Sequence, residues 1–564
     1  MLSQIYNRKD ASKQGLKDNY QNGLCHSGHG KRRRRVPVSS SLFVFILLCL
    51  TVATLSCGSP PTDPRTVMPA DSLVYMETKD LGALVAALTE SEIYQQAAVT
   101  KPDLSGINGI EMAVAVTGFE TTEQELTEEN SILNFQPRFV AVAETRFWNF
   151  QVLHFVEEEL GLFISEAYGG EALLETSKKH DGDYYVWKSQ DGRKAYALVI
   201  GSLVFFGNDE TAIEKCLAVK RGEVPSIAGN PKLTSDERIA FGYISPEGIG
   251  QLANISGISM AQRAGGDPET QSFIARLLPE LLRNSLKEAT WTAVKTDNGI
   301  EDRFDIVTNT DVATVLNETL VPSGNSTDGR IIGGLPATPE SITRYDLRDP
   351  QVAWRSVLLT GTKLTDEVSG AILMAFSSAV FEPYGVDAPE ALLSSVGPVI
   401  YTVRFDEDGE KAIFIASVKD AAKVKTSLAK EFEISKPPEK VGEAETWLSK
   451  DNDVRALFVD DIVVAGDPEE VLEFHKRFVS AQVSPADTPL SAIFAGKQAS
   501  AVTVTNDRTT ALKVADVISD KKEDAANVNM RWITETRFNR SGIERKMTSQ
   551  LGLIGLIASQ FAKE

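Results

Sequence analysis

Few side chains in this sequence have the types and spacing that catalysis or metal binding requires. His154, Glu157 and Glu158 lie at positions i, i+3 and i+4 of a predicted helix, a spacing that can supply part of a metal site. No second group of ligands accompanies them, so the pattern favours a solvated helix face. Residues 406–409 begin like a calcium-binding loop, but the later ligands do not follow at the required spacing, which favours a hairpin turn.

Cys216 is the only cysteine after Cys57. It lies in a predicted helix with Ile213 and Leu217 on the same side, which predicts a buried structural thiol, since a nucleophilic cysteine needs a basic and partly exposed setting. Histidine is equally scarce after the leader: His154, His180 and His475. The sequence contains no nucleophile elbow, zinc-protease motif or phosphate-binding glycine loop. We therefore predict no catalytic residue, metal or cofactor, and leave open an enzyme that relies on paired carboxylates.

Two apolar clusters are candidates for contact surfaces. Phe147, Trp148 and Phe150 form a dense aromatic group, which is expected to cap the core near a turn or, alternatively, to present a ligand-contact patch. Residues 551–558 are apolar but too few to span a bilayer. They are expected to form a terminal helix packed on the body, with contact to a partner or a membrane surface as the alternative.

Charge is divided unevenly along the chain. The net charge is −20, yet residues 1–56 carry nine Lys or Arg against two Asp or Glu, a local +7 that leaves −27 for the rest. A polyanion of this size repels the phosphate backbone, which excludes nucleic acid as a partner. The apolar content of 42% and charged content of 24% are typical of globular protein.

The N-terminal segment has the order of an export signal. A basic run at 31–35 precedes an apolar stretch at 42–55, which is followed by small residues. An apolar helix of this length reaches about 21 Å, short of the ~30 Å hydrocarbon core, which favours a cleaved signal over a permanent span. The basic run stays in the cytoplasm by the positive-inside rule, so the rest of the chain is expected outside.

The residues at the end of the apolar stretch, Thr54-Leu55-Ser56-Cys57, resemble the lipobox of bacterial lipoproteins. In that family the cysteine becomes the new N-terminus and carries the lipid, and the resemblance assigns this role to Cys57. The family usually has leucine three residues before the cysteine, where this chain has Thr54. An uncleaved signal anchor and a simple cleaved signal are the alternatives. We expect a body held at the membrane of a bacterial cell envelope, on its periplasmic or surface side.

The strongest internal signal is a repeat. Segments 187–210 and 447–469 share one order of polar turns and apolar runs, with an offset of 260 at the tryptophan that opens each segment and 259 at a later glycine. Two-residue turns within each segment predict hairpins. Each segment then runs into a helix, which we expect to be capped by Asn208 in the first copy and by Asp467 in the second.

The similarity extends to both ends of the repeated unit. Trp291 and Trp532 each open a predicted hairpin with glycine in the turn, and Asp80 and Asp349 each begin a predicted helix. The chain is therefore divided as follows: 1–57 basic leader and apolar signal or anchor, 58–68 tether, 69–310 first unit, 311–334 linker, and 335–564 second unit with a C-terminal helix.

Strands joined by hairpins and mixed with helices predict an α+β fold made of two tandem copies of a mainly antiparallel sheet-plus-helix unit. Two such units are expected to lie side by side about a pseudo-twofold axis, with a groove between them.

The start of the first unit, Pro-Ala-Asp-Ser-Leu-Val-Tyr at 69–75 before a short helix, resembles a bacterial family of exported proteins and lipoproteins, the domain-of-unknown-function 3352 family. The family has no assigned activity, so the resemblance implies localisation and not mechanism. We expect a non-enzymatic, envelope-anchored lipoprotein that binds or scaffolds an unknown protein. The alternatives are a carrier of an apolar ligand in the groove between the units and a carboxylate-based enzyme without a recognisable motif.

Overall fold

The computed structural model describes residues 61–562, apart from 128–129, 171, 234–237, 265–267, 408, 433, 435–436, 484–488, 496 and 520–527. The leader and the predicted lipid attachment site, Cys57, lie outside the described residues. Within the described part of the chain, no helix combines the length and the apolar character needed to cross a membrane.

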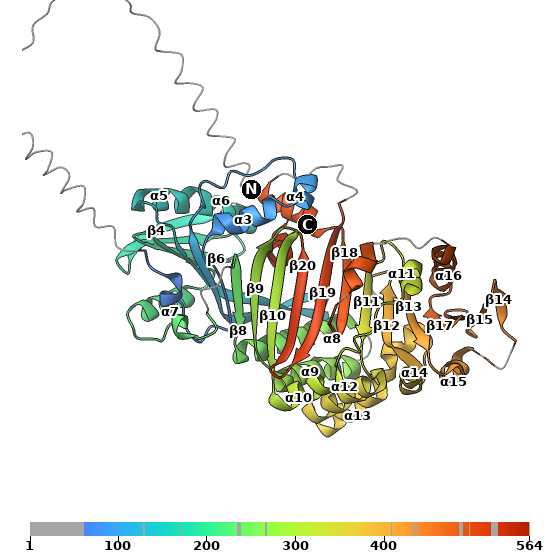
Figure 1. Ribbon diagram of the computed structural model, residues 1–564. Helices are drawn as coiled ribbons and strands as arrows, with labels where there is room; N and C mark the ends of the chain where they lie inside the picture. The colour runs from blue at the N-terminus through green and yellow to red at the C-terminus, as the bar shows by residue number, and fades with distance from the viewer. Residues whose placement is uncertain are drawn as a thin grey trace, which may run out of the picture.

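The protein has an α+β fold built on one antiparallel sheet, in which the described residues form twenty strands (Figure 1). The first half of the chain contributes ten neighbouring strands in this order: β4 (Leu173–Lys179), β5 (Gly182–Lys188), β6 (Lys194–Ile200), β7 (Leu203–Gly207), β3 (Asn130–Glu144), β2 (Glu111–Thr127), β1 (Val74–Thr78), β8 (Ala240–Ile244), β9 (Leu286–Thr296) and β10 (Gly299–Thr308).

The second half contributes ten more strands in an equivalent order: β14 (Glu439–Val441), β15 (Ala444–Leu448), β16 (Arg455–Val459), β17 (Ile462–Gly466), β13 (Ala412–Val418), β12 (Val396–Arg404), β11 (Ser341–Asp346), β18 (Ala501–Asp507), β19 (Met530–Asn539) and β20 (Gly542–Ser549). Each strand of the first half thus has a counterpart at the same place in the second. The hairpins predicted from the repeat are present as β6–β7, β16–β17, β9–β10 and β19–β20. The division into two tandem units at the stated boundaries stays a prediction.

The two halves are joined strand to strand, because β10 pairs antiparallel with β20 from Ile300↔Ser549 to Val307↔Gly542. The halves therefore share one continuous sheet at the place where a groove was expected. A turn glycine lies at each end of this ladder, with positive φ angles of 124° at Gly299 and 144° at Gly542. A Cβ atom at Gly299 would lie 2.4 Å from the carbonyl oxygen of Ser549, so only glycine allows the strands to approach this closely.

Helices begin largely where the sequence predicts. Asp80 caps α3 (Leu81–Thr89) and Asp349 caps α12 (Pro350–Leu364), each by accepting a backbone N–H of the first turn. Asp467 accepts the N–H groups of two residues that open α16 (Pro468–Val483). The prediction for Asn208 was wrong.

The cap of α7 (Glu210–Lys220) is Asp209, whose carboxylate accepts the N–H of Thr211 at 3.1 Å. Asn208 instead pairs with the backbone of β3: its side-chain oxygen accepts the N–H of Phe139 at 2.9 Å, and its amide donates to the carbonyl of Pro137 at 2.8 Å. A side chain committed to the neighbouring strand cannot also cap the helix.

The sheet has two faces, which we name after residues that they carry. The Glu77 face includes, as direct cross-strand neighbours, Glu77, Phe241, Thr292, Arg303, Lys546 and Glu535. Its outer parts are covered by η2 (Pro64–Val67) and α7 in the first half and by α11 (Gly329–Gly334), α16 and α17 (Pro489–Phe494) in the second.

The opposite face, the Trp291 face, carries most of the remaining helices. Its outer strands are covered by α5 (Asn149–His154), a π-helical turn (Phe155–Leu160) and α6 (Gly161–Ala167) in the first half and by α14 (Pro389–Ser395) and α15 (Ala421–Phe432) in the second. Its central strands pack against α3, α4 (Glu92–Ala97), α18 (Thr510–Ile518) and α19 (Gly552–Ser559).

The remaining helices lie together at the other end of the central strands (Figure 1): α8 (Pro246–Ala264), α9 (Pro268–Ser285), α10 (Thr310–Thr319), α12 and α13 (Glu367–Phe376). The two halves also contact each other on the Trp291 face, in addition to the ladder between β10 and β20. One example is the hydrogen bond of 2.9 Å between the Tyr94 hydroxyl on α4 and the Ser519 hydroxyl that follows α18.

Candidate functional site

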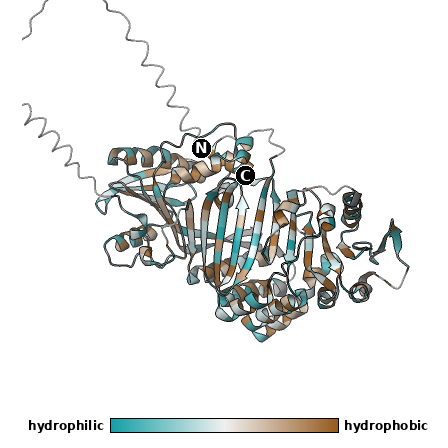
Figure 2. Cartoon of the chain, viewed as in Figure 1, coloured by the Kyte–Doolittle hydropathy of each residue, from teal (hydrophilic) through white to brown (hydrophobic). Residues whose placement is uncertain are grey.

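The central strands β9, β10, β20 and β19 leave part of the Glu77 face uncovered, as the exposed Arg303 and Asp305 show. They lie side by side in Figure 1 with no helix drawn across them, and the helices that pack on them belong to the Trp291 face. Figure 2 shows hydrophilic as well as hydrophobic residues along these strands. A strand whose two faces meet core and solvent alternates in this way. We call this uncovered area the central face.

Like charges lie opposite each other on the central face where the halves meet. Arg303 on β10 is the direct partner of Lys546 on β20, and Asp305 is the direct partner of Glu544. Like charges at such positions are destabilising on their own. The arrangement therefore needs counter-charges, or a ligand, to offset the repulsion.

Buried carboxylates supply part of these counter-charges. Glu301 accepts hydrogen bonds from Arg303 at 2.7 Å and forms an ion pair with Lys546 at 2.5 Å. Burial alone would raise the pKa of Glu301, but these two cations hold the pKa below its ordinary value. On the next strand, Glu535 accepts from Lys497 and Arg537.

The basic side chains of the central face nevertheless reach solvent. The side chain of Arg303 is 61% exposed and that of Lys546 is 41% exposed, whereas that of Glu301 is only 10% exposed. Glu301 thus lies beneath the two bases, whereas Asp305 is exposed on the same face. Such a surface offers donors and charge to a docking partner.

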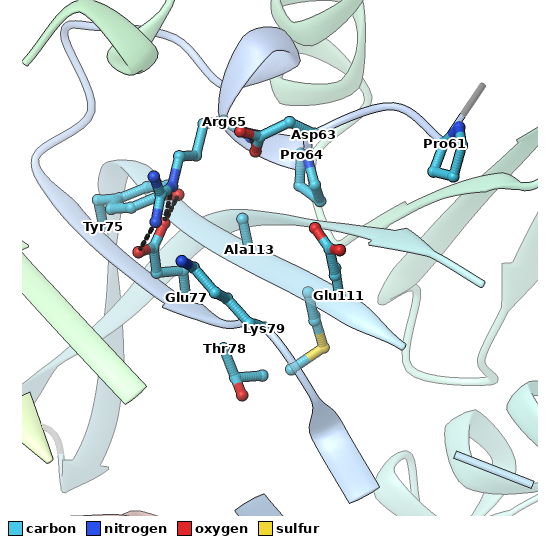
Figure 3. Close-up of a pocket in the computed structure, with 11 residues that line it drawn as sticks. Pro61, Asp63, Pro64, Arg65, Tyr75, Glu77, Thr78, Lys79, Glu111 and Ala113 are labelled. Carbon is cyan, nitrogen blue, oxygen red and sulfur yellow. Dashed lines mark hydrogen bonds and ion pairs between the residues drawn. The ribbon is translucent and has the colours of Figure 1, made fainter. Parts of the chain in front are cut away.

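A polar pocket of about 320 Å³ lies where β1 and β2 meet η2 (Figure 3). Its centre is Glu77, whose carboxylate accepts two hydrogen bonds from the Arg65 guanidinium, at 2.6 and 2.7 Å. The same carboxylate accepts from the Tyr75 hydroxyl and from Arg238, both at 2.7 Å. Arg238 also lies over the ring of Phe241, so the pocket adjoins the central face.

The Glu77 cluster is an internal ion-pair network. Burial alone would raise the pKa of Glu77, but the hydrogen bonds of Arg65 and Tyr75, with the charges of both arginines, lower the pKa below 4.5. Burial and the Glu77 charge raise the pKa of the Tyr75 hydroxyl, so Tyr75 stays protonated. Both oxygens of Glu77 already accept hydrogen bonds, which makes this carboxylate unsuited to act as a general base.

The residues singled out from the sequence are not brought together. Cys216 is fully buried on α7 with its sulfur 4.0 Å from that of Met68, and burial raises the pKa of its thiol to about 12. On the helical segment that begins at Asn149, His154 Nδ1 lies 3.3 Å from Glu158 Oε1, and both side chains are exposed. His475, the counterpart of Cys216, is buried on α16 and contacts the carbonyl oxygen of Val441 at 3.0 Å.

The structure also shows where the other residues singled out from the sequence lie. Asp406 lies between β12 and β13, where its carboxylate accepts the N–H groups of Gly409 and Lys411, as a turn requires. Among the described residues, no three His, Cys, Asp or Glu side chains are grouped so that they could hold a metal ion.

The aromatic group of the sequence is divided between core and surface. Phe147 packs against the core beneath α5, whereas Trp148 and Phe150 are exposed.

Sequence reasoning missed the charged groups that line the pocket and the central face. Tyr75 and Glu77 alternate along β1 and so share a face, which is a readable signal. Their partner Arg238 is 161 residues away from Glu77, and no local pattern connects the two. The register of β10 against β20, which sets the like-charge pairs, has no local signal either.

Comparison with models of protein families, with curated proteins and with proteins of solved structure gave no match for this chain.

Proposed function

We propose that this protein is a non-enzymatic, envelope-anchored lipoprotein of a bacterium, which binds or scaffolds another protein through the central face. The observation that carries the proposal is the pair of exposed bases, Arg303 and Lys546, held opposite each other above Glu301. An acidic patch on a partner would relieve their repulsion, so complementary charge would stabilise the complex. The export-like leader and the acidic body support a location outside the cytoplasm.

Charge reversal on the central face tests the binding role. Arg303→Glu combined with Lys546→Glu is expected to lower recovery of the partner from cross-linked membranes at least about tenfold, because like charges would face the partner. Quantitative mass spectrometry of material co-purified with the full chain measures the loss. Arg303→Gln with Lys546→Gln should give a smaller loss in the same direction.

A matched control changes the net charge equally, but elsewhere. Arg221→Glu with Lys476→Glu alters two exposed side chains away from the central face, one directly after α7 and one on α16. These variants should retain the partner at the level of the unmodified chain. Equal recovery with the central-face and the control variants would contradict the proposal.

The anchor is tested by acylation. Cys57→Ala is expected to abolish incorporation of labelled fatty acid and to slow removal of the leader, because the thiol is the proposed attachment point. Labelled palmitate with gel fluorography measures the first effect, and a pulse-chase measures the second. Ser56→Ala, one residue away, should leave both unchanged, and labelling that persists in Cys57→Ala would refute the attachment site.

A carrier role has one observation in its favour. An apolar cavity of about 150 Å³ lies between β1, β2, β8 and β9 and the helix α19, with Met76, Trp291 and Ile554 among its lining residues. Ligand pockets are commonly about 300–1,000 Å³, so this cavity suits only a small apolar molecule. The central face therefore supports the scaffold proposal more strongly.

A further inference from the structure

The helical segment formed by α5, the π-helical turn and α6 carries large apolar residues on its exposed surface as well as on its buried side. Val152, Val156 and Ile164 are buried against β5, β6 and β7. Four large apolar residues, Trp148 just before α5 and Phe150, Phe155 and Leu162 within the segment, are instead exposed, with exposed fractions of 67%, 70%, 40% and 57% respectively. We call these four residues the outer stripe. A surface helix normally carries polar residues on the side that faces water, so a stripe of this kind marks a contact surface.

The chain enters the folded body close to this stripe. The backbone N–H of Thr62 donates to the carboxylate of Glu144 at 3.0 Å. Glu144 is the last residue of β3, and Trp148 follows it by four residues. The entry point of the chain and the outer stripe therefore belong to the same corner of the molecule.

The distance from this corner to the proposed anchor is short. Cys57 precedes Thr62 by five residues. A fully extended chain covers at most about 3.6 Å per residue, so the attachment point lies within about 18 Å of Thr62. Any lipid on Cys57 therefore holds this corner, and not the opposite end of the sheet, against the bilayer.

We propose that the outer stripe inserts into the interface of the bilayer that holds the N-terminal anchor, so that the body lies on the membrane in a fixed orientation. Trp and Phe side chains favour the boundary between headgroups and acyl chains, where an aromatic ring is partly apolar and the indole N–H stays hydrated. The inference rests on the proposed anchor for the nearness of the membrane. A zwitterionic surface fits best, because exposed Glu157 and Glu158 flank the stripe and repel anionic headgroups.

Trp148 is a built-in reporter of this contact. The other five tryptophans, Trp187, Trp291, Trp354, Trp447 and Trp532, are buried or half-buried. The full chain is reconstituted into phosphatidylcholine vesicles with and without brominated acyl chains, which quench only tryptophans at the bilayer. Subtracting the emission of Trp148→Phe from that of the unmodified chain isolates the Trp148 signal while an aromatic ring is kept in place.

We expect bromine to reduce the Trp148 signal at least about twofold, as interfacial insertion requires. The matched control is Met260→Trp in the Trp148→Phe background. Met260 is 52% exposed on α8, which lies at the end of the central strands away from α3 and α4 (Figure 1). The emission of this control should be insensitive to bromine.

Fatty-acid labelling of the same preparation separates this inference from the anchor. A labelled chain whose Trp148 signal is unquenched would overturn the inference and leave the anchor intact. An unlabelled chain that remains with the vesicles and shows a quenched Trp148 would support the inference and refute lipid attachment at Cys57. Equal quenching of Trp148 and of the Met260→Trp reporter would also overturn the inference, because contact would not be confined to the stripe.

Discussion

Glu77→Ala is expected to lower the free energy of unfolding by about 3–5 kcal/mol, because it removes a buried carboxylate that pairs with two largely buried cations. Arg238 has only 4% of its side chain exposed and Arg65 only 16%, so neither guanidinium regains full hydration when Glu77 is lost. Urea unfolding followed by far-ultraviolet circular dichroism measures the change.

The matched control for Glu77 is Glu90→Gln. Glu90 pairs with Lys295 at 2.7 Å, but both side chains are about half exposed, and an exposed pair contributes at most about 1 kcal/mol. If Glu77→Ala and Glu90→Gln had similar small effects, the cluster would not stabilise the fold as argued.

Lowering the pH should reduce the stabilisation that the Glu77 cluster gives to the folded protein. The pKa of Glu77 is lowered in the folded protein, so the folded state binds this proton less readily than the unfolded state. The stabilisation is therefore complete above pH 4.5, the ordinary pKa, and is lost as the pH falls through the lower folded-state pKa. Glu77→Ala should lack this part of the acid sensitivity.

Asp302→Ala is the second change with a large expected effect, about 3 kcal/mol, because two donors lose a charged acceptor in a buried place. Asp302 is fully buried on the Trp291 face. Its carboxylate accepts the indole N–H of Trp291 at 2.8 Å and the backbone N–H of Leu553, also at 2.8 Å. In the second bond, a side chain on β10 satisfies a backbone N–H in the first turn of α19. Asp302→Ala should therefore also loosen this C-terminal helix.

Hydrogen exchange of α19, together with urea unfolding, measures the effect of Asp302→Ala. Asp305→Asn is the control: Asp305 lies on the same strand but on the Glu77 face and is exposed, so its replacement should change stability by less than about 0.5 kcal/mol. Unchanged protection of α19 in Asp302→Ala would show that another contact holds the helix.

The pH dependence at Asp302 has the opposite sign to that at Glu77. Burial raises the pKa of Asp302 above 3.8, so the folded state binds this proton more readily than the unfolded state. The unmodified chain should therefore gain stability relative to the non-titrating variant Asp302→Asn as the pH falls through the folded-state pKa. If the difference in unfolding free energy between the unmodified chain and Asp302→Asn stayed constant with pH, the pKa of Asp302 would not be raised as stated.

Much of the local structure could be predicted because its causes are local. The α+β class is confirmed, since alternating apolar runs and two-residue turns dictate antiparallel hairpins. The caps at Asp80, Asp349 and Asp467 are confirmed for the same reason, because a short acidic side chain satisfies the backbone next to it. Asn208 shows the limit: the competing partners, the N–H of Phe139 and the carbonyl of Pro137, were on β3, far away in the sequence.

The candidate sites depended on distant contacts and were largely hidden from sequence reasoning. The central face arises only when β10 meets β20, and the Glu77 cluster only when Arg238 reaches across from the segment before β8. Trp148 was expected mainly to cap the core, yet the adjacent Phe147 fills that place and Trp148 points to solvent. Neighbouring aromatic residues cannot be assigned to core or surface without the helix axis.

The ladder between β10 and β20 also has a consequence for the order of events during folding. A chain that emerges from its N-terminus presents β10, which ends at Thr308, long before β20 begins at Gly542. Until then the inner edge of the first half carries unpaired N–H and C=O groups, which is a template for any free strand. Because β20 begins so long after β10 ends, it can close on its own chain or on the waiting edge of a neighbouring copy. Slow arrival of the final hairpin would therefore favour an exchanged dimer with the same ladder.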